Sequence, residues 1–226
     1  MKSINKFNKI NFLIWGLALS SIVSLEVFVL GCTQEDNNMD NATVDSQKAN
    51  LIALSYLELN NNQYVLKLSE ANAISLGISK FDYNRMLTEV QKTNDFIIKS
   101  QADGIKVDIN DPKCFNINTS NIRLKSDNEL YAGSFTLPDD NSQVSFYGTV
   151  PSGMSKIQIT STIGCFLGGS TGFVYFAGQS IYYSATGFMG GSTTVTLPYS
   201  SGGIVTITGS TYCGNGGIVT ITYLRN

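Results

Sequence analysis

The hydrophobic pattern of the chain changes its period once, near residue 105. From residue 51 to residue 104, most apolar positions recur at the spacing of a helix face, and after residue 105 apolar and polar residues alternate. Side chains repeat on one face about every 3.6 residues in a helix and every two residues in a strand. The pattern therefore predicts an α+β chain, with a small N-terminal helical region over 51–104 and an antiparallel β-sandwich over 105–226.

One helix is predicted from Ser79, a candidate N-cap, to a stop at Gly104. Arg85 and Glu89 are expected to pair on its outer face, as are Asp95 and Lys99. The predicted inner face consists of Phe81, Tyr83, Met86, Leu87, Val90, Asn94, Ile97 and Ile98, with Asn94 as its polar exception.

Two smaller elements are predicted before this helix. Ser69 and Gly77 bound a short helix, because serine favours N-caps and glycine favours helix ends. Two apolar runs flank Asn60–Gln63, which indicates a hairpin.

Short alternating segments separated by Gly, Pro, Asn and Asp turn signals fill the second region. They predict a two-sheet sandwich or a closed sheet, with strands at 130–137, 142–150, 155–163, 172–177, 180–187, 192–198, 203–209 and 217–224. The heptad GGIVTIT occurs twice, at 202–208 and 216–222. The two copies are predicted to form one hairpin, with both isoleucines on one face and Val and Thr on the other.

Charge is missing from the end of the chain. No Asp, Glu, Lys or Arg lies between Lys156 and Arg225, and the formal net charge of the whole chain is −2. The chain thus has no basic excess to attract nucleic acid. Three interpretations stay open for the uncharged region: an ordinary outer face of Thr, Ser, Gln and Tyr, a face that binds a protein or glycan, or uncharged edge strands that pair with further copies.

Tyrosines supply the candidate binding residues of this region. Tyr175, Tyr182 and Tyr183 lie in the aromatic stretch FVYFAGQSIYYSATGF and offer rings to a sugar. The competing interpretation follows from alternation, which places Phe173, Tyr175 and Tyr183 in a core.

The chain contains no histidine, and this absence excludes several kinds of catalysis. The segment GGSTG at 168–172 matches the nucleophile elbow of serine hydrolases but has no base to serve it, so it is predicted to be a turn. A zinc site and an activated cysteine are disfavoured for the same reason. Asp108, Asn110 and Asp111 match part of a calcium loop, but Pro112 interrupts that loop.

The predicted function is therefore a non-enzymatic binding module without catalytic residues, metal or cofactor. A structural, self-assembling surface protein is the alternative, and a glycan hydrolase with two carboxylates is the less favoured one. Cys114, Cys165 and Cys213 predict one disulfide and one thiol, and their pairing stays open.

The N-terminus predicts a secretion signal over 1–31. Lysines at 2, 6 and 9 precede an apolar stretch that ends in VLGC at 29–32, a sequence that resembles the lipobox of bacterial lipoproteins. The resemblance implies cleavage before Cys32, lipid on that residue and attachment to a membrane. A single transmembrane helix is the alternative, which Glu26 and three serines disfavour.

A polar, acidic segment at 32–50 is predicted to be a flexible tether. Its start, QED at 34–36, is similar to the surface-export signals of Bacteroidota lipoproteins. That similarity implies a lipid-anchored protein of the cell outer membrane that faces outward. An ordinary acidic linker facing the periplasm is the alternative.

Overall fold

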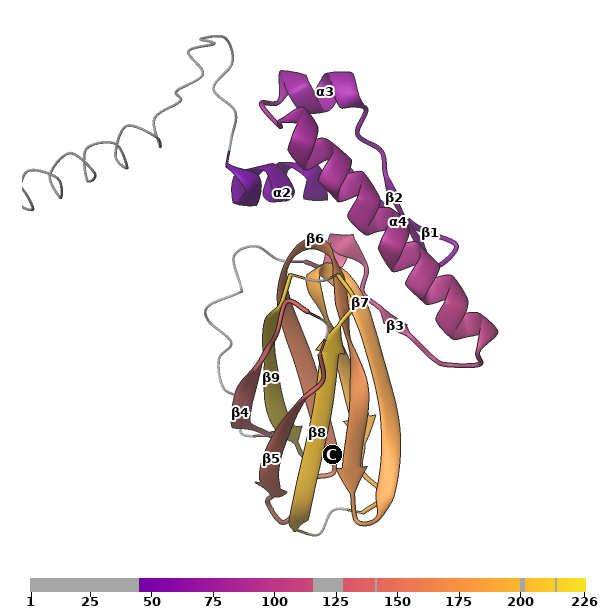
Figure 1. The fold of residues 1–226 in the computed structure, drawn as a ribbon. Coiled ribbons are helices and arrows are strands. Elements are labelled where there is room, and N and C mark those ends of the chain that lie inside the picture. The colour runs from indigo at the N-terminus through magenta and orange to yellow at the C-terminus, as the bar shows by residue number, and fades with distance from the viewer. Residues whose placement is uncertain (1–44, 116–127, 141, 200–201, 214) are drawn as a thin grey trace, which may run out of the picture. The chain divides into compact units, whose positions relative to one another are not determined.

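A computed structural model describes residues 45–115, 128–140, 142–199, 202–213 and 215–226. The described residues cluster as one unit (Figure 1). The predicted signal peptide, Cys32 and the tether up to residue 44 lie outside the described residues. Over the described ranges, no helix combines the length and apolarity that a membrane crossing requires.

The helical part is larger than the sequence predicts. Helix α2 spans Ser46–Leu54 and begins within the predicted tether, because the side chain of Asp45 accepts a hydrogen bond from the N–H of Lys48. Ala49 and Asn50 of α2 are buried. The tether prediction is therefore wrong from residue 46 onward.

The predicted hairpin and short helix are confirmed. Strands β1 (Leu57–Asn60) and β2 (Gln63–Leu66) pair antiparallel, and Asn61 and Asn62 between them have positive φ, as a two-residue hairpin turn requires. Helix α3 spans Glu70–Ser75 and is capped by Ser69.

Helix α4, at Lys80–Ala102, confirms the strongest helix prediction and the Ser79 cap. Tyr83, Met86, Val90 and Ile97 are buried as expected, but Phe81, Leu87 and Ile98 are exposed. The buried stripe is thus narrower than the apolar pattern. Two hydrogen bonds explain why the polar Asn94 lies in that stripe. Its side-chain amide accepts the N–H of Tyr64 and donates to the carbonyl of Tyr64, both at 2.8 Å.

Seven strands form the main sheet. They are β3 (Asp108–Ile109), β4 (Glu129–Leu137), β5 (Val144–Val150), β6 (Lys156–Phe176), β7 (Gln179–Thr196), β8 (Gly203–Thr211) and β9 (Gly217–Leu224). All neighbours pair antiparallel except β3 and β7, which are parallel. A short 3₁₀ helix, η1, spans Pro112–Cys114 after β3. The predicted α+β class is therefore confirmed.

The central hairpin of the sheet merges strands that the sequence separates. The predicted strands 155–163 and 172–177 are both parts of β6, and 180–187 and 192–198 fall mostly within β7. GGSTG is therefore not a turn but part of β6. Its glycines serve a close approach of two backbones, because a Cβ at Gly169 would collide with the carbonyl of Ala185, and one at Gly172 with the carbonyl of Thr208.

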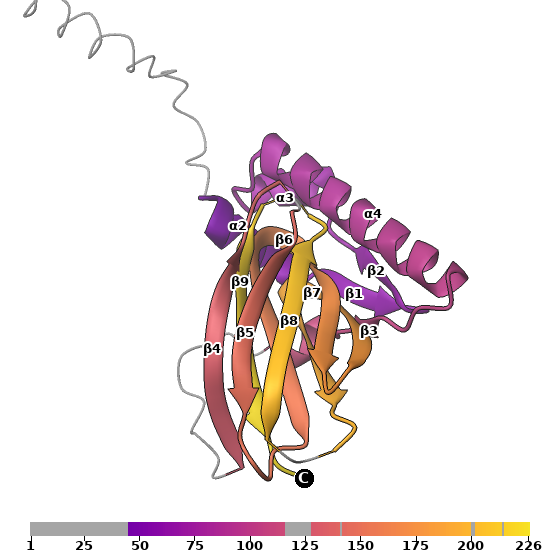
Figure 2. The same cartoon turned by 60° about the horizontal axis from the view of Figure 1, so that its bottom comes forward.

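The two GGIVTIT copies do not form a hairpin. One edge of β6 pairs with β7, and its other edge pairs with β9 over 156–163 and with β8 over 170–176. The copies thus occupy successive lengths of the same strand edge. Each also has its own outer neighbour, β5 for β8 and β4 for β9, and β4 and β5 lie side by side (Figure 2).

The predicted facing of the heptad is also wrong. Ile204 and Ile218 are exposed, whereas Val205, Ile207, Val219 and Ile221 are buried in one cluster. The two isoleucines of a copy are three residues apart, so an alternating strand must place them on opposite faces.

A buried ion cluster joins α4 to the sheet. Arg85 contacts Asp82 at 3.1 Å and Glu89 at 3.0 Å. Glu89 Oε2 accepts the N–H of Phe166 at 2.6 Å and, at 3.4 Å, that of Leu167. The predicted outer-face pair therefore faces inward, and its carboxylate satisfies two backbone donors at the irregular stretch of β6.

The pKa of Asp82 in this cluster is lowered by its hydrogen bonds. Burial by itself raises the pKa of the carboxyl, but hydrogen bonds from Ser79, Ser46 and Arg85 outweigh burial and lower it below the ordinary 3.8. A depressed pKa stabilises the fold above the unfolded-state value, and this stabilisation is lost as pH falls through the folded-state value.

We therefore expect Asp82→Asn to destabilise the protein at neutral pH and much less in acid. The free energy of unfolding, measured with urea from about pH 6 down to about pH 3, should differ between wild type and variant at pH 6 and converge toward pH 3. Asp95→Asn on the exposed side of α4 is the control and should show a small difference throughout. A constant gap for Asp82→Asn would contradict the assignment.

Candidate functional site

The structure places two of the three predicted binding tyrosines on one side of the sheet and buries the third. Tyr175 lies on β6 with 41% of its surface exposed, and Tyr182 lies on β7, half-buried, on the same side of the sheet. Tyr183 is 3% exposed and belongs to the hydrophobic core. The sequence prediction is wrong for Tyr183, because adjacent residues of a strand point to opposite faces.

Tyr183 has a structural role. Its hydroxyl donates to the carbonyl of Thr208 at 2.9 Å, which ties β7 to β8 across β6. Burial raises the pKa of this hydroxyl well above the ordinary 10.0. The phenol is thus a buried hydrogen-bond donor and is not available to a ligand.

Phe173 takes the place that the sequence assigns to Tyr183. Its ring centroid lies 5.9 Å from that of Tyr175 and 5.3 Å from that of Tyr182, the latter edge-to-face at 74°. Phe173 and Tyr182 are also cross-strand partners. The alternation argument, which places Phe173, Tyr175 and Tyr183 in the core, is therefore wrong for the first two and right for Tyr183.

Neighbouring strands extend this cluster. Tyr175 pairs with Thr206 of β8, and Thr206 pairs in turn with Tyr147 of β5, so that both tyrosines lie in one row across three strands. Tyr147 is 72% exposed, and Ile204, two positions before Thr206, is 75% exposed. We call the set Tyr147, Phe173, Tyr175, Tyr182 and Ile204 the aromatic face.

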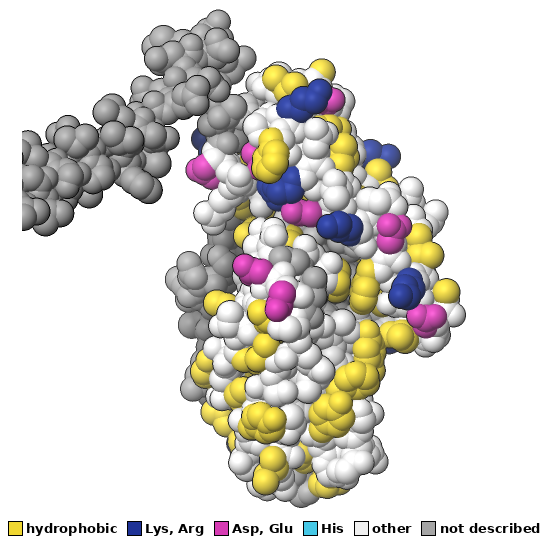
Figure 3. Space-filling model, viewed as in Figure 1, with side chains coloured by type: hydrophobic (Ala, Val, Ile, Leu, Met, Phe, Trp, Pro, Cys, Tyr) yellow, Lys and Arg dark blue, Asp and Glu magenta, His cyan; other side chains and the backbone are white. Residues whose placement is uncertain are grey.

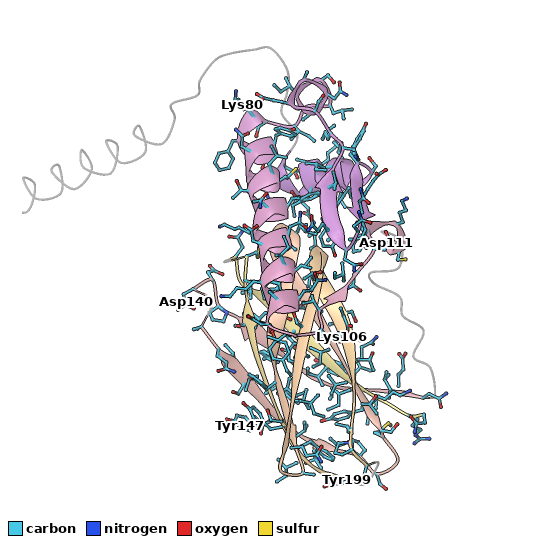
Figure 4. The ribbon with its side chains drawn as sticks, turned by 90° about the vertical axis from the view of Figure 1, so that its right-hand side faces the viewer. Lys80, Lys106, Asp111, Asp140, Tyr147 and Tyr199 are labelled. Carbon is cyan, nitrogen blue, oxygen red and sulfur yellow. A yellow bond between two sulfur atoms is a disulfide. The ribbon has the colours of Figure 1, made fainter. Side chains whose placement is uncertain are left out.

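The surroundings of the aromatic face are uncharged. Figure 3 shows hydrophobic side chains among uncharged polar atoms over the part of the sheet distant from the helices, while Lys, Arg, Asp and Glu gather on and near the helical part. The hydroxyls nearest the rings include Thr171, which donates to the Tyr182 hydroxyl, and Thr208, which accepts from the N–H of Phe173 at 3.1 Å. Figure 4 shows Tyr147 on the part of the sheet away from the helices, whereas Lys80 lies at the opposite end of the molecule. The arrangement presents rings and hydroxyls without charge.

The sequence contains a signal for this face that composition alone does not reveal. In FVYF at 173–176, Phe173 and Tyr175 alternate with Val174 and Phe176, which are buried. Choosing between the two sides of such a segment requires knowing which side the core occupies.

The catalytic and metal motifs of the sequence have structural roles. Asp108 accepts from Thr193 and pairs with Lys106 at 2.9 Å, while the Asn110 side chain donates to the carbonyls of Thr186 and Ser192. Asp111 caps η1. Over the described residues, no group of three or more His, Cys, Asp or Glu side chains is placed to hold a metal ion.

The cysteines pair in one of the ways that the sequence allows. Cys165 and Cys213 form a disulfide with a Cα–Cα distance of 6.5 Å, and Cys114 is an exposed free thiol. Tyr212, next to Cys213, stacks on Phe96 of α4 with ring centroids 4.1 Å apart. The disulfide therefore fixes the β8–β9 connection at the place where it contacts the helical part.

Comparison with known proteins adds no assignment to this geometry. No family model matches the chain, and no curated protein matches it.

Proposed function

We propose that the protein is a lipid-anchored, surface-exposed binding module of the cell outer membrane, without catalytic activity, and that its β-sandwich holds a neutral glycan on the aromatic face. The observation that carries the binding role is the aromatic face itself, a row of exposed rings on a sheet region with no charged residue. The support for the lipid anchor is the VLGC sequence that ends at Cys32.

The chemistry of the face suits a sugar better than an ionic ligand. Rings provide flat apolar area for the C–H faces of a pyranose, and they lose little conformational entropy on binding. The half-buried Thr171 and Thr206 next to the rings can exchange hydrogen bonds with sugar hydroxyls. A charged ligand would gain no partner here and would lose hydration.

We expect Tyr175→Ala to weaken glycan binding at least tenfold, or about 1.4 kcal/mol. The full chain is screened on a glycan array, and affinity for the glycan found is then measured by titration calorimetry. Tyr147→Ala should act in the same direction, because the two rings share a row. Tyr131→Ala is the matched control, since Tyr131 is also an exposed strand tyrosine but lies on β4, outside the aromatic face.

Equal affinity of the Tyr175 variant and the wild type would count against this face. Binding of a protein instead of a glycan by the same residues would keep the face and change the ligand class.

Self-association is a second candidate, and the edge strands favour it. On its edge away from β6, β7 pairs over the described residues only with the short β3, at Ala185 and Thr186, and the sequence of β7 carries no charge to block strand addition. Size-exclusion chromatography of the same samples separates the two roles. An oligomer that Tyr175→Ala leaves intact, with no glycan bound, would favour assembly.

A further inference from the structure

A pocket lies beside the other half of β6. It has a volume of about 440 Å³, within the range of small-molecule sites, and lies between α2, η1 and the central hairpin. Thr160 and Thr162 form its floor, and both lie in the part of β6 that pairs with β9, residues 156–163. The aromatic face uses the part of β6 that pairs with β8. The two sites are therefore distinct along the strand.

The walls of the pocket are apolar. Leu51 of α2, Phe115 after η1 and Phe188 of β7 line it. The Phe115 and Phe188 rings meet edge-to-face with centroids 4.7 Å apart. They offer a ligand two ring surfaces held in a fixed relation.

The floor of the pocket is polar but uncharged. The hydroxyls of Thr160 and Ser192 lie 3.2 Å apart across β6 and β7, and either can donate. Each hydroxyl keeps acceptor capacity for a further partner. Asp111 is the one charged residue that lines the pocket among the described residues, and it accepts the N–H of Lys113.

The backbone of β7 is irregular where it lines the pocket. Met189 has φ of 50° and Gly190 has φ of 134°, an irregularity inside β7 where both residues line the pocket. A non-glycine residue with positive φ is uncommon in a strand, and such strain occurs preferentially at functional sites. A side chain at Gly190 would collide with the carbonyl of Ser161, so the floor stays bare at this position.

We propose that this pocket binds a small neutral molecule with an apolar face and hydrogen-bonding groups on its opposite side. The apolar face packs against Leu51, Phe115 and Phe188, and the polar groups bind Thr160 and Ser192. Anions are disfavoured, because no cationic side chain among the described residues lines the pocket and Asp111 repels them.

Cys114 lines the same pocket and is a free, exposed thiol, which makes it a built-in reporter. In disulfide exchange, its thiolate attacks a probe disulfide, forms a mixed disulfide with one half and releases the other half as a thiol. Two probes are compared on the full chain, one that transfers neutral 2-phenylethanethiol and one that transfers anionic 3-mercaptopropionate. Peptide mapping by mass spectrometry reads the adduct on Cys114.

We expect the neutral adduct to survive at least a tenfold higher concentration of 2-mercaptoethanol than the anionic adduct. Thr162→Trp fills the pocket and should remove this preference. Thr194→Trp is the matched control, because Thr194 is an exposed β7 residue outside the pocket lining, and it should retain the preference.

Circular dichroism confirms that both variants are folded, and Ser192→Met replaces Thr162→Trp if that variant is not. Equal stability of the two adducts on the wild type would overturn the proposal, as would a preference that persists in the filled variant. Loss of glycan binding by Tyr175→Ala with this preference unchanged would show that the pocket acts independently of the aromatic face.

Discussion

Replacing Glu89 by alanine should destabilise the protein by about 3 kcal/mol, the largest effect expected of any single side chain that joins the helical part to the sheet. The carboxylate is buried, accepts the backbone N–H groups of Phe166 and Leu167, and pairs with Arg85. Its loss leaves two buried backbone donors without an acceptor, and each unsatisfied donor costs about 1–3 kcal/mol. Arg85 also loses one of its two ion pairs but keeps the contact with Asp82. Urea unfolding at neutral pH measures the change.

Two further variants separate the roles of this carboxylate. Glu89→Gln keeps an acceptor oxygen for the backbone but removes the charge, so we expect about half of the loss. Glu58→Ala, at an exposed position on β1, is the control and should change stability by less than about 0.5 kcal/mol. Equal effects of Glu89→Ala and Glu58→Ala would show that the contact with β6 does not stabilise the fold.

Removing the Cys165–Cys213 disulfide should cost about 4 kcal/mol. The bridge closes a loop with a sequence separation of 48, and a cross-link lowers the entropy of the unfolded chain in proportion to the logarithm of the loop length. Cys213→Ser removes the bond and leaves Cys165, which is buried, as a free thiol. The midpoint of thermal unfolding, measured by circular dichroism, should fall accordingly.

Cys114→Ser is the control, because Cys114 is exposed and unbridged. This variant should unfold like the wild type in oxidising buffer, and both should lose stability when a reductant opens the bridge. A wild type whose unfolding does not respond to reduction would contradict the assigned role of the disulfide.

Local signals in the sequence were sufficient for the elements whose partners are close along the chain. Ser79 and Ser69 cap helices because a serine hydroxyl satisfies the N–H of a residue three positions ahead. Asn61 and Asn62 turn a hairpin because asparagine tolerates positive φ. Each of these preferences acts within a few residues, so the sequence displays it directly.

Only the tertiary structure decided which glycines turn the chain and which side of a strand is inside. Gly169 and Gly172 look like turn residues, yet they lie within β6 because distant backbones, at Ala185 and Thr208, approach them too closely for a side chain. Phe173 lies on the outer face although alternation placed it in the core, and Tyr183 is buried although it was a candidate binding residue, since alternation defines two faces but not which of them meets the core.

The sequence by itself determined that the last third of the chain is a sheet without charge and without a histidine for catalysis. Strand pairing, by contrast, decided that the aromatic face forms from β5, β8, β6 and β7. β6 is long enough to pair with both GGIVTIT strands along one edge, and this places β8 and β5 beside the rings of β6 and β7. Pairing joins residues far apart in sequence through backbone hydrogen bonds, for which every residue has an acceptor and every residue except proline a donor. Such bonds carry no residue-specific mark, which is why the side chains do not reveal them in advance.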